Sequence, residues 1–448
     1  MTTGIDDPRP TSRAAAGPAC DDTVFDVIGV GFGPSNIALA LALGESPGPA
    51  PTAHFFEKQP RFSWHPGMLL PEATMQVHFL KDLVTLRDPS SRFSFLNYLR
   101  EQGRLVDFVN HKMIFPSRVE FHDYFRWCAS ACADKVTYGC EVLSVEPVGG
   151  AGDGRLLDVH LRQTDELGSR TLRRRTRNVV IAPGLRRRLP DGVTESDRVW
   201  HSSGLLQRLD GLPPGGGGLR FAVVGAGQSA AEVTAHLHDR FDGARVRAVF
   251  TPYGYAPADD SPFANRIFDP AAVDYFFEAP PAARRMLLER HRNTNYAVVD
   301  QELIEDLYAT WYQEKVRGEQ RLLIENATRL LECDESQDTV RLTLESLITS
   351  EKTEVECDYL VCATGYHPAA PDELLRPDLR RLCRKDSLGQ PRAGRDYRLE
   401  MVDGVEWGIY VQGSTEDTHG LTSTLLSMTA VRAGEIADAL RDRLRRAS

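Results

Sequence analysis

The sequence lacks several features that would place it in other classes of protein. No apolar run approaches the roughly 20 residues of a membrane-spanning helix, so we expect no membrane segment. The first 22 residues contain no apolar core of a secretory signal, and we interpret them as a disordered tail. Basic residues do not predominate, since 53 Lys and Arg stand against 63 Asp and Glu, a net charge of −10. This balance argues against nucleic acid as a partner.

Cysteine occurs in no pattern typical of a disulfide framework. The eight cysteines are scattered along the chain, and no C-x-x-C pair is present. We therefore expect reduced, packed thiols in a cytoplasmic protein. A disulfide reductase, which needs a redox-active cysteine pair, is disfavoured for the same reason.

The residues that are present indicate a globular chain built around a glycine-rich turn. With 448 residues, 42% of them hydrophobic, two or three domains are expected. The apolar run Phe25–Val30 leads into Gly29, Gly31 and Gly33, and an Ala/Leu-rich helical pattern follows. Such a strand, turn and helix lets the backbone approach a diphosphate, which the helix N-terminus attracts. One turn of this kind is a weak signal.

A second glycine-rich turn strengthens the evidence for dinucleotide binding. The stretch Phe221–Leu237 contains Gly225, Gly227 and Ala230, with the Ser229 hydroxyl at the start of the helix. Two such turns predict two bound dinucleotides. The expected fold class is α/β, with two Rossmann-like dinucleotide-binding domains and a small, mainly helical substrate-binding region.

The residues that end the next strands predict which dinucleotide binds at each turn. Glu57 ends an apolar strand 24 residues after Gly33 and can accept a hydrogen bond from a ribose 2′-hydroxyl. After the second turn, the strand ending at Phe250 is followed by Thr251, with no acid. This favours a 2′-phosphate there, although Arg245 and Arg247 lie on a strand and can be simply solvated.

An unusual segment separates the two turns. Residues 62–99 are rich in aromatics, Met and Pro, and contain Gln76, His78, Lys81 and Asp82 among apolar neighbours. Lys81 could anchor a carboxylate, pair with Asp82 or lie on the surface. The three possibilities stay open on these grounds alone.

The second half of the chain adds a mixed helical stretch and a returning strand. Asn265 and Asn295 fall between residues 259 and 312, where turn or cap roles are the simplest interpretation. Tyr359–Cys362 predicts a buried strand, and we expect the following Ala363–Gly365 turn to return to the first nucleotide. His419 and Gly420 precede an amphipathic C-terminal helix.

These patterns divide the chain at its glycine-rich and polar connections. The first dinucleotide domain is expected at 23–203 and 356–440, the second at 204–255 and 320–355, the helical region at 256–319, and a basic tail at 441–448.

Several motifs resemble the microbial amine N-hydroxylating monooxygenases, above all the L-ornithine N(5)-monooxygenases of hydroxamate siderophore biosynthesis. The resemblance runs from about Phe25 to Ile436. The segment MQVHFLKDLVTLRDP is far more specific than any glycine motif. The others are VGFGPSN (30–36), GAGQSA (225–230), DDSPFAN (259–265), NTNY (293–296), ATGY (363–366) and HGLTSTLLS (419–427).

The resemblance implies roles for named residues, with FAD and NADPH as cofactors and no metal. It implies that FAD lies against Gly29, Gly31, Gly33, Pro34, Asn36, Glu57, Gln76, Val142, Thr424, Leu425 and Leu426. It implies that NADPH contacts Arg118, Ala226, Gly227, Gln228, Ser229 and Asn295. The amino acid would contact Lys81, Asn265, Asn295 and Ser427. Two departures stand out, because relatives often carry Arg at the position of Thr251 and an acid at that of Arg266.

The implied reaction is hydroxylation of a primary side-chain amine by a C4a-hydroperoxyflavin, with O₂ as co-substrate. The implied substrate is L-ornithine, converted to N5-hydroxy-L-ornithine, and Gln76 is a candidate shield for the reactive flavin. No acid–base catalytic residue is identified. L-lysine, putrescine or cadaverine remains an alternative substrate, and another two-dinucleotide flavoprotein reductase a remote one. The resemblance also implies a homo-oligomer, either a dimer or a tetramer.

Overall fold

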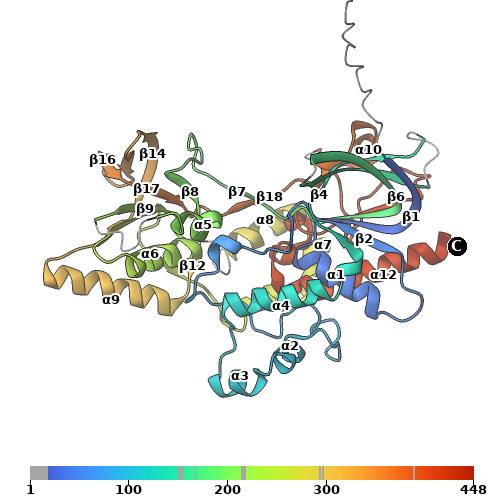
Figure 1. Cartoon of the computed structure of the whole chain (residues 1–448), viewed down its shortest axis with the longest axis horizontal. Coiled ribbons are helices and arrows are strands. Elements are labelled where there is room, and N and C mark those ends of the chain that lie inside the picture. The colour runs from blue at the N-terminus through green and yellow to red at the C-terminus, as the bar shows by residue number, and fades with distance from the viewer. Residues whose placement is uncertain are drawn as a thin grey trace, which may run out of the picture.

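The structure is a computed structural model that describes residues 19–149, 155–166, 168–212, 218–291, 294, 297–386 and 389–447. Two sheets lie side by side along the long axis of the molecule, and helices surround both (Figure 1). The order of elements confirms the expected α/β class.

The first sheet has seven strands in the order β3-β2-β1-β6-β5-β4, and β19 pairs with β6. Neighbours among β1, β2, β3, β6 and β19 are parallel, whereas β4, β5 and β6 pair antiparallel. β1 begins inside the segment 1–22 that the sequence predicted as a tail, and residues 1–18 lie outside the described part. The strands are β1 (Ala19–Val30), β2 (Ala53–Phe56), β3 (Val136–Thr137), β4 (Cys140–Pro147), β5 (Leu157–Asp165), β6 (Gly168–Ile181) and β19 (Gly408–Val411).

The helix that follows the first glycine turn is buried on every side. Residues 36–43 of α1 (Pro34–Glu45) are all buried, as the run of Ala and Leu predicts. α12 (Thr429–Ala447) and α4 (Arg118–Ser130) pack against α1. This packing fixes the N-terminus of α1, where the first dinucleotide is expected. The remaining helices of this half are α2 (Phe95–Glu101), α3 (Leu105–His111) and α10 (Pro377–Leu382).

The second sheet is parallel throughout and has the order β13-β10-β9-β17-β8. Its strands are β8 (Val199–His201), β9 (Arg220–Val224), β10 (Arg245–Val249), β13 (Leu322–Glu325) and β17 (Tyr359–Cys362). An antiparallel meander adjoins it, made of β14 (Thr328–Glu335), β15 (Val340–Ser346) and β16 (Lys352–Cys357). Its helices are α5 (Leu205–Leu209), α6 (Gln228–Arg240) and α9 (Gln301–Arg317).

Two expectations about the second sheet were wrong. β8 and β17 belong to this sheet, although the proposed boundaries place residues 199–201 and 359–362 in the first domain. The Ala363–Gly365 turn therefore meets the second glycine motif, not the first. A Cβ on Gly225 would lie 2.3 Å from the Ala363 carbonyl oxygen. An isolated apolar strand carries no signal for which of two similar sheets it joins.

A helical region covers the junction between the two sheets. It contains η4 (Ala264–Phe268), α7 (Pro270–Glu278) and α8 (Pro281–Arg290), and α7 and α8 pack on α11 (Glu416–His419). Asp269 directly precedes α7, but its side chain does not cap the helix. Short strand pairs complete the junction: β7 (Leu185–Arg187) with β18 (Tyr366–Pro368), and β11 (Ala256–Pro257) with β12 (Val298–Val299).

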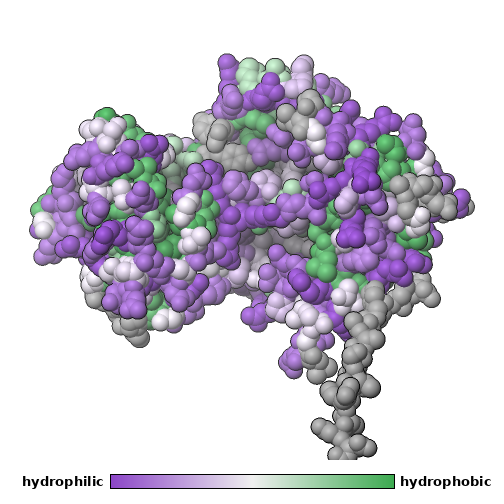
Figure 2. Space-filling view, turned by 90° about the horizontal axis from the view of Figure 1, so that it is seen from above, coloured by the Kyte–Doolittle hydropathy of each residue, from purple (hydrophilic) through white to green (hydrophobic). Residues whose placement is uncertain are grey.

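Hydrophilic residues predominate on the face of the molecule that Figure 2 shows. On the face seen from above, apolar residues form small separate groups (Figure 2). Among the described residues, no helix combines the length and the apolar character that crossing a bilayer requires.

Candidate active site

The first glycine turn presents an open helix N-terminus. Gly31 has φ +80°, and a Cβ there would lie 2.6 Å from the Ala182 carbonyl oxygen. Gly33 caps α1 without a side chain, and Pro34 occupies the first turn. The first N–H groups of α1 are therefore uncovered at a site that favours negative charge.

Asn36 serves the shape of this turn. Its side chain is fully buried, and Nδ2 donates to the carbonyl oxygens of Val30 at 3.0 Å and Gly31 at 2.7 Å. Its Oδ1 accepts a hydrogen bond from Gln412 Nε2 at 2.8 Å. The side chain thus holds the turn from within, and any contribution to cofactor binding is made through the backbone. Gln412, which the sequence did not single out, reaches this turn from the end of β19.

Glu57 stands where the spacing predicted, directly after β2. Its two carboxylate oxygens accept hydrogen bonds from the backbone N–H groups of Phe32 at 2.7 Å and Gln59 at 2.8 Å. Each carboxylate oxygen can accept more than one hydrogen bond, so capacity for a ribose hydroxyl remains. Glu57 thereby links the end of β2 to the glycine turn.

A cleft opens beside the N-terminus of α1, and a buried cation lines it. Arg432 of α12 is 2% exposed and donates to the carbonyl oxygens of Thr422 and Ser423 and to the Ser35 hydroxyl. The cleft is lined by Gly33, Pro34, Ser35, Ala182, Gly184, Leu185, Gln412, Gly413, Ser414, Ser423, Thr424 and Arg432.

The charge of Arg432 fits this cleft to an anion. Its Nε has no hydrogen-bond partner, and no carboxylate forms an ion pair with it among the described residues. Burial lowers its pKa. A buried, unpaired guanidinium is costly unless an anion offsets it. The helix N-terminus and Arg432 together suit the diphosphate of a dinucleotide, and sequence inspection missed this arginine because it lies inside an amphipathic helix.

The second glycine turn has the same construction. Gly225 has φ +148°, and Gly227 caps α6 without a side chain. Ala226, Gln228 and Ser229 therefore lie at another open helix N-terminus. Two equivalent positive helix ends, one on each sheet, are what two dinucleotides require.

The structure does not bring Arg245 to the end of β10 where Thr251 lies exposed. Arg245 begins β10, at its opposite end, and Arg247 forms an ion pair with Glu325. Arg266, the other departure, is exposed and pairs with Asp269 at 3.3 Å.

Arg118, expected at NADPH, is engaged with protein groups. Its guanidinium forms a bidentate pair with Glu232 of α6, at 2.9 and 2.7 Å, and donates to the Met68 carbonyl oxygen. The side chains of both partners are largely buried, 12% and 5% exposed. This pair joins α4 of the first half to α6 of the second.

Lys81 is not paired with Asp82. The Asp82 carboxylate is 2% exposed and accepts hydrogen bonds from the backbone N–H groups of Val84, Thr85 and Phe95. Burial raises the pKa of this carboxyl group. Asp82 therefore shapes the loop and leaves Lys81 without an acid within ion-pair distance among the described residues.

The Lys81 ammonium instead faces the helical region. Its Nζ lies 5.6 Å from the centre of the Phe268 ring, in the same short helix as Asn265. Burial lowers the pKa of Lys81, and Asp269 opposes this effect. Asn265 donates its Nδ2 to the Asp260 carbonyl oxygen at 2.7 Å. η4 also packs against η7 (Leu421–Ser423), which leads to Ser427.

Ser427 has a buried hydroxyl group that makes no hydrogen bond among the described residues. It lies in η8 (Leu426–Met428), is 4% exposed, and its Oγ has no hydrogen-bond partner among the described residues. Such a group in a native fold suggests an absent ligand. Asn295, the remaining predicted substrate residue, lies outside the described residues.

The other predicted FAD residues lie in three places. Thr424 lines the cleft, and Leu425 and Leu426 follow it directly. Val142 lies in β4 with its side chain buried in the core, so the structure does not bring that side chain to the cleft. Gln76 is exposed and donates its Nε2 to Asp300 at 2.7 Å.

Comparisons with known proteins agree with this architecture. The family model described as L-lysine 6-monooxygenase/L-ornithine 5-monooxygenase matches residues 23–368. An L-ornithine N(5)-monooxygenase of Burkholderia cepacia is 44% identical over 418 residues, covering 92% of this chain and 93% of that protein.

Two solved structures extend the likeness to three dimensions. The ornithine N-hydroxylase of Kutzneria sp. 744, described with reduced FAD, NADP⁺ and L-ornithine, has a TM-score of 0.89 and 45% identity. The match covers 95% of this chain and 100% of the Kutzneria chain. An L-lysine 6-monooxygenase of Pseudomonas syringae has a TM-score of 0.78 and 31% identity, with 94% of this chain and 100% of that chain covered. The chain belongs to the L-lysine 6-monooxygenase/L-ornithine 5-monooxygenase family.

Proposed function

We propose that the protein is an FAD- and NADPH-dependent monooxygenase that converts L-ornithine to N5-hydroxy-L-ornithine for a hydroxamate natural product or siderophore. The observation that carries the proposal concerns Lys81, in a chain of this family. It has no acid within ion-pair distance among the described residues and lies beside the short helix of Asn265. The reaction balances as amine plus O₂, NADPH and H⁺, giving hydroxylamine, water and NADP⁺.

FAD is assigned to the first turn and NADPH to the second. When bound, reduced flavin supplies the activation of O₂ for transfer of one oxygen atom to the amine. The backbone of the first turn, the N-terminus of α1 and Arg432 would hold the diphosphate, and Glu57 the adenosine ribose. The NADPH residues would be Arg118, Ala226, Gly227, Gln228, Ser229 and Asn295, with Arg118 acting also through Glu232.

The substrate roles follow from charge. Lys81 is proposed to bind the α-carboxylate, because it is a half-buried cation with no acid partner among the described residues. Asn265, Asn295 and Ser427 would receive the rest of the amino acid. Neutral amides suit this task, since a carboxylate beside the side-chain amine would keep it protonated and unreactive.

L-Lysine and diamines are the alternative substrates, and a substrate panel distinguishes them. Turnover with L-ornithine, L-lysine, putrescine and cadaverine should be measured while hydroxylamine and H₂O₂ are both quantified. We expect the highest hydroxylamine yield per NADPH with L-ornithine, and a much lower yield with the diamines, which lack a carboxylate for Lys81. A higher yield with L-lysine or putrescine would show that this amine, and not L-ornithine, is the substrate. NADPH oxidation without hydroxylamine from any of the four amines would favour another flavoprotein class.

Assembly and compartment are also inferred. We infer a homo-oligomer, dimer or tetramer, which is supported by apolar side chains exposed on α3, where Val106 is 70% and Val109 63% exposed. Mass measured in solution by light scattering tests this. The seven cysteines whose side chains the structure describes are unpaired, which supports a reducing compartment such as the cytoplasm.

A further inference from the structure

One carboxylate joins the two halves of the site. Asp300 Oδ2 accepts hydrogen bonds from Gln76 Nε2 at 2.7 Å and from Gln228 Nε2 at 3.0 Å. The Asp300 backbone N–H also donates to Gln228 Oε1 at 2.8 Å. These partners are 224 and 72 residues away in the sequence. Gln76 belongs to the first half of the chain, and Gln228 begins the helix of the second glycine turn.

The position of Asp300 makes this use of its side chain unexpected. Asp300 is the N-cap residue of α9, a 17-residue helix, and an Asp there normally accepts a hydrogen bond from the first turn. No such side-chain cap is formed. The carboxylate is turned away from its own helix and toward the two glutamines. β12, which precedes Asp300, lies beside α6 (Figure 1). The path of the chain therefore places the Asp300 carboxylate next to Gln228, the first residue of α6.

Because a carboxylate only accepts hydrogen bonds, it determines how the side-chain amides of Gln76 and Gln228 are oriented. Ionised Asp accepts hydrogen bonds and cannot donate them, so each glutamine must direct its NH₂ group toward Asp300. The exposed Gln76 therefore presents its oxygen elsewhere, and Gln228 is fixed at both ends of its amide. Two flexible side chains acquire one orientation each.

The network continues to a buried ion pair. Gln228 Nε2 also donates to Glu232 Oε1 at 3.1 Å, and Glu232 holds Arg118. Arg118 in turn donates to the Met68 carbonyl oxygen, in the segment that leads to Gln76. Together with the chain between Met68 and Gln76, these polar contacts form a closed circuit between the two halves. Asp300 and Glu232 are its two side chains without an assigned cofactor contact, and only Asp300 binds both glutamines.

We propose that Asp300 is a positioning residue for reduction of the flavin: it fixes Gln76 and Gln228 and thereby the nicotinamide half relative to the flavin half. The inference rests on the assignment of FAD and NADPH in the proposed function, and not on the identity of the amine. A misplacement of about 1 Å between reacting groups can cost ~100-fold in rate. Asp300 itself touches no substrate in this assignment.

The test is anaerobic reduction of the FAD-loaded enzyme by NADPH, followed by the absorbance of oxidised flavin. We expect Asp300→Ala to lower the limiting rate at saturating NADPH by about 10-fold or more. FAD content and the overall fold should stay unchanged, since the substitution removes two side-chain hydrogen bonds and no helix cap. Asp300→Asn, which keeps one oxygen able to accept both hydrogen bonds, should restore most of the rate.

A matched control and a double variant complete the test. Glu302→Gln removes a charge from the exposed first turn of the same helix and should leave the limiting rate unchanged. Gln228→Ala combined with Asp300→Ala should cost little more than either change alone, because the two act as a unit. The proposal would be overturned if Asp300→Ala reduced the flavin at the same limiting rate as the wild type, or if it changed only the apparent affinity for NADPH. Normal flavin reduction in the wild type without hydroxylamine formation would instead contradict the proposed function.

Discussion

At the scale of single residues, the site depends on two cations that form no ion pair with a carboxylate among the described residues. Lys81 and Arg432 are both partly or fully buried cations, and the acids that act on them, Asp269 and Glu435, lie beyond ion-pair distance. Desolvated charges of this kind destabilise the free protein, and they become favourable when an anion arrives. The two cations therefore mark two anions, the carboxylate of the amino acid and the diphosphate of the cofactor.

Replacing Lys81 separates binding of the amino acid from oxidation of NADPH. We expect Lys81→Ala to raise KM for L-ornithine at least 10-fold, because a charge-assisted hydrogen bond worth about 1.5–3 kcal/mol is lost. NADPH oxidation should continue, with a larger share of H₂O₂ per hydroxylamine. Both products are measured against NADPH consumed. Lys352→Ala, which changes an exposed lysine on β16, is the control, and an unchanged KM in Lys81→Ala would remove the assigned role.

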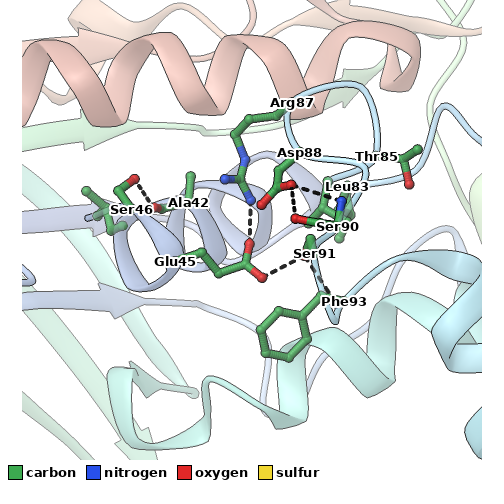
Figure 3. Close-up of polar contacts among 12 residues, drawn as sticks. Ala42, Glu45, Ser46, Leu83, Thr85, Arg87, Asp88, Ser90, Ser91 and Phe93 are labelled. Carbon is green, nitrogen blue, oxygen red and sulfur yellow. Dashed lines mark hydrogen bonds and ion pairs between the residues drawn. The ribbon is translucent and has the colours of Figure 1, made fainter.

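At the scale of elements, the loop that carries Lys81 is tied to two helices. Arg87 forms an ion pair with Glu45 at 2.5 Å at the end of α1, and Ser91 donates to the same carboxylate at 2.6 Å (Figure 3). Arg87 also passes close to α12, since a Cβ on Gly434 would lie 2.8 Å from its Cδ. The arginine in the most specific sequence motif therefore positions a loop and contacts no ligand in this assignment.

Removing the acid of this pair should weaken both the fold and the binding of substrate. Glu45→Ala leaves Arg87 largely buried without its partner, and we expect a loss of about 2–4 kcal/mol in the free energy of unfolding. KM for L-ornithine should rise because the Lys81 loop loses its support. Denaturant unfolding and steady-state kinetics measure the two effects. Glu332→Ala on the exposed side of β14 is the control, and equal stability of the two variants would contradict this role of Glu45.

Patterns in the sequence predicted local structure better than side-chain partners. The strand, glycine turn and helix at Phe25–Leu43 are confirmed, because backbone geometry and burial there depend on neighbours in sequence. The position of Glu57 followed from spacing alone. Asp300, Glu232 and Gln412 could not be found in this way, since their partners lie 72 to 376 residues away. Long-range hydrogen bonds leave no periodic signal in a single sequence.

At the scale of the whole molecule, buried histidines link stability to pH. Burial lowers the pKa of His419 to about 4, and the ring stacks on Tyr397 with ring centres 4.3 Å apart. Burial also lowers the pKa of His65 to about 4. Both residues are thus neutral in the folded protein and charged at lower pH once it unfolds.

The sign of the effect follows from proton binding. Between pH 6.5 and pH 4 the unfolded chain binds more protons at these histidines than the folded protein does, so stability falls as pH falls. For His419 alone, the loss between pH 7 and pH 5 is about 2 kcal/mol. Denaturant unfolding at several pH values should show a smaller pH dependence in His419→Asn than in the wild type. His111→Gln on α3 is the control, because it removes a histidine whose side chain is exposed. An identical pH dependence in wild type and His419→Asn would show that His419 is protonated as readily in the folded protein as in the unfolded chain.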